Sequence, residues 1–110
     1  MGKYSIGEFE EIVMLTVAVL FDEAYGISIK TEIEERLERS VSVGAMRTAL
    51  TRLEKKGFLE SEHGESSTIR GGRPKLYFTI TAYGLKAAKD AKETRNEMWN
   101  ALPQIALKVN

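Results

Sequence analysis

At 110 residues the chain is long enough for one domain but short for a deep enclosed active site, so a binding protein is the expected class. It contains no cysteine, which excludes disulfide bonds and thiolate metal sites, and we expect no cofactor. The longest apolar run, residues 12–21, is shorter than the roughly 18 residues of a membrane span. The N-terminus does not resemble a signal peptide, so a cytoplasmic protein without membrane association is expected.

Positive and negative charges balance over the whole chain, with 16 of each, but they are unevenly distributed. Residues 1–42 carry four Lys or Arg and nine Asp or Glu, whereas residues 43–75 carry seven and four, and residues 76–110 carry five and three. A local cluster of cations is what nucleic-acid binding requires, even when the net charge is zero. Ordinary solvated cations remain the alternative interpretation for any single Lys.

The first expected helix, Gly7 to Asp22, is apolar on nearly all sides. A helix of that kind must be buried on two sides. In so small a domain the second cover could come from another subunit, which is a first indication of a homodimer. The apolar positions are Phe9, Ile12, Val13, Met14, Leu15, Val17, Val19, Leu20 and Phe21.

Two further helices are expected over residues 28–38 and 43–56, joined by a short turn. The earlier one has a single apolar stripe and an otherwise charged, acidic surface, which suits solvent better than a DNA groove. The later one is therefore the better recognition helix of a helix-turn-helix.

Ser42 is the expected N-cap of this recognition helix, and Val43, Met46, Leu50 and Leu53 form its apolar stripe. The opposite face carries hydrogen-bond donors and no carboxylate, as a DNA-reading surface should. Together with the cap, the expected DNA-binding residues of the helix are Ser42, Gly44, Arg47, Thr48, Thr51, Arg52 and Lys55.

Two short strand-like runs, residues 58–63 and 76–80, follow the recognition helix and are separated by a polar, glycine-rich segment. They predict a hairpin whose tip presents Arg70, Arg73 and Lys75 to phosphates or to a minor groove. The predicted fold is therefore mainly α with a small β-hairpin, a winged helix-turn-helix over residues 1–80.

A last long helix is expected from Ala82 to about Leu102, with Thr81 as its cap and Pro103 at its end. Its apolar stripe is longer than a small body can cover, so residues 81–110 are expected to form a C-terminal dimerisation helix and tail that belong to the same compact unit. The candidate residues for a dimer interface or a ligand site are Leu85, Ala88, Ala91, Arg95, Met98, Trp99 and Leu102.

Several short motifs occur in a characteristic order: GEFE at 7–10, YG at 25–26, SVG at 42–44, LTRLEKKG at 50–57, GGRPKLY at 71–77 and TAYG at 81–84. In these motifs the chain resembles the PadR-like family of winged-helix transcriptional regulators, in the short form with one C-terminal helix. Many members have an aromatic residue where this chain has Arg47.

The resemblance implies a homodimeric regulator, expected to be a repressor, that binds a palindromic operator in double-stranded DNA. Some short members of the family bind flat aromatic compounds at the dimer centre, against an aromatic residue of the last helix. Trp99 occupies that helix here, although packing within a dimer interface is the favoured interpretation of a Trp on an apolar stripe.

An enzyme is a poor alternative, because the single histidine, His63, lies on an expected strand and no carboxylate pair stands near a nucleophile. The Gly71-Gly72 pair lacks the continuation of a phosphate-binding loop. A second alternative is a winged-helix protein-interaction module that does not bind DNA. Loss of duplex affinity with salt would favour the regulator over that module.

Overall fold

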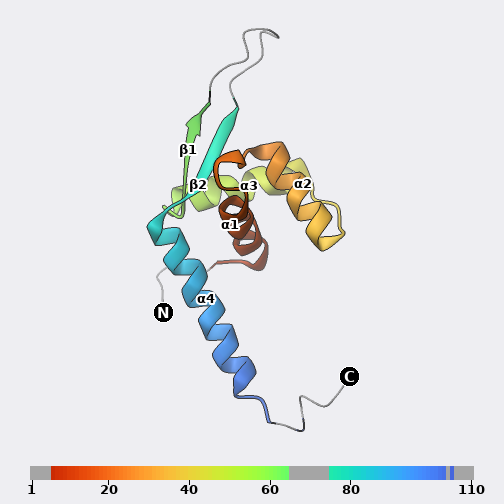
Figure 1. Cartoon of the computed structure of the whole chain (residues 1–110), viewed down its shortest axis with the longest axis vertical. Coiled ribbons are helices and arrows are strands. Elements are labelled where there is room, and N and C mark those ends of the chain that lie inside the picture. Colours follow the sequence, from red (N-terminus) through yellow and green to blue (C-terminus); the bar gives the residue numbers. More distant parts are fainter. Residues whose placement is uncertain (1–5, 65–74, 104, 106–110) are drawn as a thin grey trace.

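The computed structural model describes residues 6–64, 75–103 and 105 (Figure 1). It confirms a mainly helical fold with a small hairpin. The elements in chain order are α1 (Glu8–Leu20), the short 3-10 helix η1 (Phe21–Glu23), α2 (Gly26–Leu37), α3 (Val43–Lys55), β1 (Leu59–His63), β2 (Leu76–Ile80) and α4 (Ala82–Asn100).

Helix α1 lies at the centre of the body, with α2, α3, the hairpin and the first half of α4 around it (Figure 1). Its buried residues recur every three or four positions, and side chains from the neighbouring elements complete the apolar core. The core residues are Val13, Met14, Val17, Ala24, Ile29, Ile33, Val41, Met46, Ala49, Leu50, Leu53, Phe58, Leu59, Phe78 and Ala88.

The expected burial of the first helix on two sides is not reached within one chain, because Leu15, Val19 and Phe21 are exposed. The helix also ends at Leu20, two residues before the expected end at Asp22. At Phe21 the backbone has a φ of 55°, which α-helix cannot continue, and the chain passes into η1.

The hairpin strands are antiparallel, with Leu59 opposite Ile80 and His63 opposite Leu76. On its other edge β2 contacts the segment before α2, where the Phe78 N–H donates to the Ala24 carbonyl at 2.8 Å. This second edge attaches the wing to the helical body. The start of α2 therefore lies beside the base of the wing.

A tight junction joins the end of α3 to the start of α4. Gly57 turns the chain out of α3 with a φ of 81°, as a helix-terminating glycine does. Thr81 caps α4 by accepting from the Gly84 N–H at 2.9 Å, and its own hydroxyl donates to the Gly57 carbonyl at 2.7 Å. Gly84 lies so close that a Cβ there would be 2.2 Å from the Phe58 carbonyl oxygen.

An ion pair also links α4 to α1. The Arg95 guanidinium donates to both carboxylate oxygens of Glu11, a residue whose side chain is almost entirely buried. These hydrogen bonds raise the pKa of Arg95 above its ordinary value. Beyond this contact α4 projects away from the body and ends at Asn100, two residues before the expected end (Figure 1).

The turn between α2 and α3 depends on Glu34. Its carboxylate accepts from the Val41 N–H at 2.9 Å and from Lys30 Nζ at 3.0 Å. The backbone hydrogen bond, followed by the interaction with Lys30, lowers the pKa of Glu34 below its ordinary value. Helix α2 begins at Gly26, earlier than the expected start at Ser28, and Ser28 Oγ accepts from the Tyr25 N–H at 3.0 Å.

We predict that Gly84→Ala lowers the free energy of unfolding by about 1–3 kcal/mol, because the added methyl group would overlap the Phe58 backbone. Urea denaturation of the full chain measures the change. Gly44→Ala is the matched control, since no atom lies within 4 Å of a Cβ at Gly44 and alanine favours helix. Equal stability of both variants would contradict the proposed close approach.

We predict that Glu34→Gln lowers the melting temperature at neutral pH and that this difference disappears in acid. A folded-state pKa below the ordinary value of 4.5 means that the ionised carboxylate stabilises the fold above that value. This stabilisation is lost as the pH falls through the folded-state pKa. Thermal unfolding between neutral and acidic pH tests the prediction, with Glu35→Gln on the exposed side of α2 as the control. A difference between wild type and Glu34→Gln that persists unchanged in acid would refute it.

Candidate nucleic-acid interface

The two faces of α3 differ sharply in exposure. Met46, Ala49, Leu50 and Leu53 are buried against the body, whereas the face expected to bind DNA is open to solvent. All the expected helix residues lie there: Gly44, Arg47, Thr48, Thr51, Arg52 and Lys55 are each exposed.

The assignment of Val43 to the apolar stripe of this helix was wrong. Val43 is 57% exposed, and Ala49 takes its place among the buried residues. Val43 is the first residue of α3, so its side chain lies at the helix end rather than over the core. Ser42 is the N-cap as expected, and its hydroxyl accepts from the Ala45 N–H at 3.0 Å.

A cleft of about 610 Å³ runs between α3 and the wing. Arg47 and Thr51 line it from the helix, and Lys75 lines it from the position just before β2, so these three expected residues come together. Glu54 also lines the cleft, which corrects the expectation of a surface without carboxylates. Glu54 lies one turn beyond Thr51 on the same side of the helix, and its carboxylate accepts from Ser61 Oγ at 2.6 Å.

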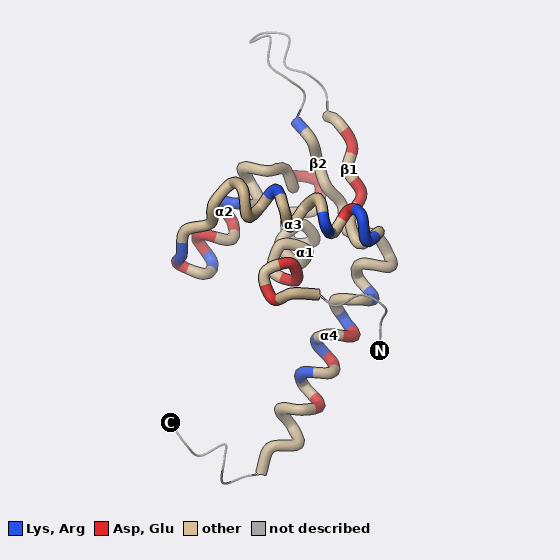
Figure 2. The backbone as a smooth tube through the Cα atoms, turned by 180° about the vertical axis from the view of Figure 1, so that it is seen from behind, with Lys and Arg blue, Asp and Glu red and all other residues tan. Residues whose placement is uncertain are grey.

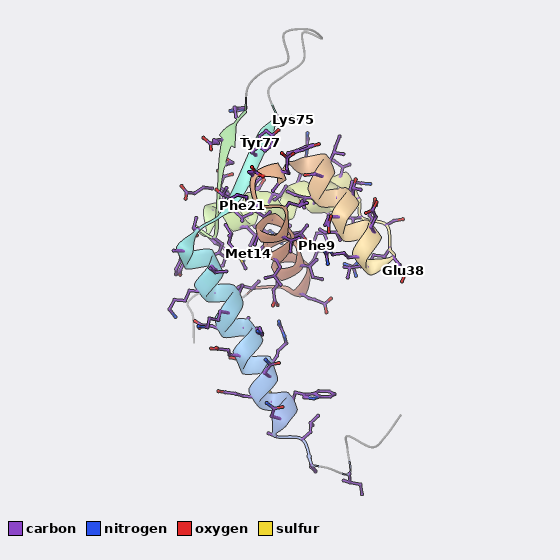
Figure 3. The ribbon with its side chains drawn as sticks, viewed as in Figure 1. Phe9, Met14, Phe21, Glu38, Lys75 and Tyr77 are labelled. Atoms are coloured by element: carbon purple, nitrogen blue, oxygen red, sulfur yellow. The ribbon has the colours of Figure 1, made fainter. Side chains whose placement is uncertain are left out.

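Lys75 immediately precedes β2, and its side chain lies near Tyr77 (Figure 3). Its Nζ is 4.2 Å from the centre of the Tyr25 ring, and Tyr25 packs edge-on against Tyr77 with ring centres 5.4 Å apart. A cation on an aromatic face is held without losing its charge. The other two expected wing residues, Arg70 and Arg73, lie outside the described residues.

The opposite edge of the exposed α3 face approaches α1. Arg52 Nη1 lies 3.8 Å from Glu10 Oε2, while Lys56 Nζ lies 2.8 Å from Glu10 Oε1. Arg52 is therefore both solvent-accessible and paired with an acidic residue from the start of α1. Figure 2 shows the basic positions along α3 and the acidic positions at the start of α1.

Besides Glu54, sequence reasoning missed Tyr25, Ile27 and Glu10 on this surface. Ile27, at the start of α2, is 73% exposed and lines the cleft with Tyr25. Glu10 contacts Arg52 of α3, although the two residues are 42 positions apart in the sequence. The only indication of Ile27 in the sequence was an apolar residue directly after Gly26, where an exposed helix start was expected to be polar. No local pattern indicates the pairing of Glu10 with Arg52.

On α4 the expected interface residues divide into two groups. Leu85, Met98, Trp99 and Leu102 are exposed, with Trp99 at 62%, and Ala91 is half-buried. Ala88 is only 4% exposed, so it belongs to the core of its own chain rather than to a free dimer surface. It lies one turn beyond Gly84, where α4 is closest to the body. Arg95 is held by Glu11 of the same chain.

A second cavity, of about 740 Å³, lies beside the first half of α4. Ala91 and Thr94 line it, as do Phe58 and Tyr83, whereas Trp99 is not among its lining residues. Within residues 6–64, 75–103 and 105, therefore, this cavity does not offer a ligand a position stacked on Trp99.

No helix in the described part of the chain is long and apolar enough to cross a membrane. Among residues 6–64, 75–103 and 105, no group of three or more His, Cys, Asp or Glu side chains is arranged to hold a metal ion.

Comparisons with known proteins agree with this geometry. The structure is similar to that of a PadR-like transcription factor from Bacteroides fragilis, with 25% identity, 84% coverage of each chain and a TM-score of 0.73. The complex structure of hsRosR is 25% identical, covers 90% of this chain and 78% of its own, and gives a TM-score of 0.67. A Bacillus cereus PadR-like transcriptional regulator shares the fold at 20% identity, with 93% of each chain covered and a TM-score of 0.71.

No curated protein sequence matches the chain. The model of the transcriptional regulator PadR-like family, in contrast, matches residues 14–90, which include α2, α3, both strands and the start of α4. Members of that family are regulators of transcription and not enzymes. The chain therefore belongs to the transcriptional regulator PadR-like family.

Proposed function

We propose that this protein is a homodimeric, cytoplasmic repressor that binds a palindromic operator through α3 and the wing. The observation that carries the proposal is the exposed face of α3, where Thr48, Arg52 and Lys55 stand free of the core. Donors of this kind, on a helix whose other face is buried, match what a major groove requires. We assign residues 1–80 to DNA binding and residues 81–110 to dimerisation, within one compact unit.

The exposed face supports a division of roles among its residues. Thr48, Thr51, Arg52 and Arg47 approach base edges, because they lie along the face of α3 that a groove would meet. Lys55 and Lys75, with Arg70 and Arg73, contact the phosphate backbone. Ser42 and Gly44 lie at the N-terminal end of α3, where backbone N–H groups favour phosphate.

The dimer is proposed from the uncovered apolar residues of α4 and α1. The stripe that begins against the body at Ala88 continues to Met98 and Trp99, which no other described residue of the chain buries. Leu15 and Val19 on α1 are exposed as well. A two-fold interface would cover both surfaces and would place the two α3 helices about 34 Å apart, one turn of DNA.

We predict that the chain binds duplex DNA with an affinity that falls steeply with salt, and that Arg73→Ala weakens all duplexes alike. Each lost phosphate contact should lower the salt slope by about 1, or about 2 per dimer. Arg52→Ala should instead cost about 1–3 kcal/mol and relax preference at one position per half-site. Selection from a random DNA pool, followed by titrations at several salt concentrations, measures both effects.

Glu62→Ala on the exposed side of β1 is a control for the wing substitutions. A palindromic selected sequence would support the operator and the dimer together. Binding to a protein partner that does not change with salt, without duplex binding, would favour the interaction module instead. Unchanged affinity and preference in Arg52→Ala would remove that residue from the base-reading group.

We predict that Trp99→Ala dissociates the dimer, because the exposed indole is the largest apolar group at the far end of α4. Sedimentation measures the oligomeric state, and Lys92→Ala on the same helix is the control. A monomeric wild-type chain, or a Trp99→Ala dimer as stable as wild type, would contradict the proposed interface.

The same tryptophan tests for a small aromatic effector. Two symmetry-related indoles would offer flat apolar faces, between which a planar ligand could stack. A ligand of this kind should quench the fluorescence of Trp99 saturably and weaken operator binding. A varied panel of planar dyes and phenolic compounds that leaves the emission unchanged would leave Trp99 as an interface residue only.

A further inference from the structure

Glu10 joins the exposed face of α3 to α1, and the expected DNA contacts do not include it. It lies in the first turn of α1, and its carboxylate contacts two cations four residues apart: Arg52 of α3 and Lys56, the residue that caps the C-terminal end of α3. Its side chain is 13% exposed, so it lies at the boundary between the core and the DNA-facing surface.

The two contacts of Glu10 are unequal. Lys56 Nζ is 2.8 Å from one carboxylate oxygen and is itself only 23% exposed, which fixes the carboxylate in place. Arg52 contacts the other oxygen through Nη1 at 3.8 Å and is 65% exposed. A guanidinium has five N–H donors, so a contact through one nitrogen leaves the others available to another acceptor.

We propose that Glu10 is a positioning residue that orients Arg52 for base recognition. This inference rests on the proposed function, because it assumes that α3 reads DNA. Glu10 itself contacts no base. It holds one side of the Arg52 guanidinium, while the remaining donors stay available to a guanine.

The physical reason is the flexibility of arginine. A free arginine side chain loses rotamer entropy when it is fixed against a base, and a pair that already restrains it reduces that loss. A bidentate contact with guanine requires a defined geometry, whereas a phosphate contact tolerates many. Glu10 should therefore favour specific binding over non-specific binding.

The negative charge of Glu10 has a second, opposite effect. A carboxylate close to a DNA-facing cation weakens the attraction between the protein and any phosphate backbone. Its removal should raise non-specific affinity while specific affinity rises less or falls. The ratio of the two affinities is therefore the quantity that reports on positioning, because a general loss of folding or charge does not change it in this way.

The experiment compares full-length wild type, Glu10→Gln, Arg52→Ala and the double variant. Each is titrated with the duplex selected by the wild type and with a scrambled duplex of the same length, at one salt concentration. Glu35→Gln, which removes an exposed carboxylate from α2, is the charge-matched control. Thermal unfolding of every variant shows that it is folded.

We expect Glu10→Gln to lower the ratio of specific to non-specific affinity by about fivefold, near the lower end of the range for one arginine–guanine contact. Glu35→Gln should leave the ratio unchanged. In the Arg52→Ala background, Glu10→Gln should not lower the ratio further. If Glu10→Gln does not fold, Glu10→Asp withdraws the carboxylate by one methylene group, keeps its charge and should also lower the ratio.

Two results would overturn the inference. One is an equal ratio in Glu10→Gln and wild type. The other is an equal fall of the ratio in the presence and absence of Arg52, which would assign the effect to Lys56 or to the fold. Failure of the proposed function is distinguishable, because the wild type itself would then show no preference for any duplex, and the inference would fall with it.

Discussion

The arrangement of this protein depends on the close approach of Gly84 to the backbone of Phe58. Phe58 follows α3 and precedes β1, so this one contact fixes α4 relative to both the recognition helix and the wing. Thr81 reinforces the junction by bonding the carbonyl of Gly57 and capping α4. Because only glycine allows two backbones to come this near, the direction in which α4 leaves the body is determined at its third residue.

Helix α1 extends this constraint to the rest of the molecule through two neighbouring carboxylates. Glu10 pairs with Arg52 on α3 and with Lys56 at its C-terminal cap, and Glu11 pairs with Arg95 on α4. One turn of α1 therefore contacts both the helix assigned to DNA and the helix assigned to dimerisation. Both carboxylates also lie in the first turn of α1, where negative charge complements the positive end of the helix dipole.

Local patterns predicted the elements well, because spacing and caps are local properties. The sequence predicted the α3 helix with its Ser42 cap, the hairpin and the Thr81 cap, and the structure confirms all of them. The expectations that were wrong depended on which residues become neighbours in the folded chain. Ala88 belonged to an apolar stripe that could equally face its own body or a second copy, and only the Gly84 contact decides that its own body covers it.

In the candidate site, too, local features were predictable from the sequence and contacts between distant residues were not. Exposure of the α3 face followed from helical periodicity, but its polar contacts did not. Glu10 is 42 residues from Arg52 in the sequence, and Glu54 accepts a hydrogen bond from Ser61 on β1. Acidic residues of α1 lie beside the cations at one edge of α3, while Thr48 and Lys55 near the middle of its exposed face are left toward solvent. The charge on that face is therefore arranged by tertiary contacts, and total composition is a poor guide to what it binds.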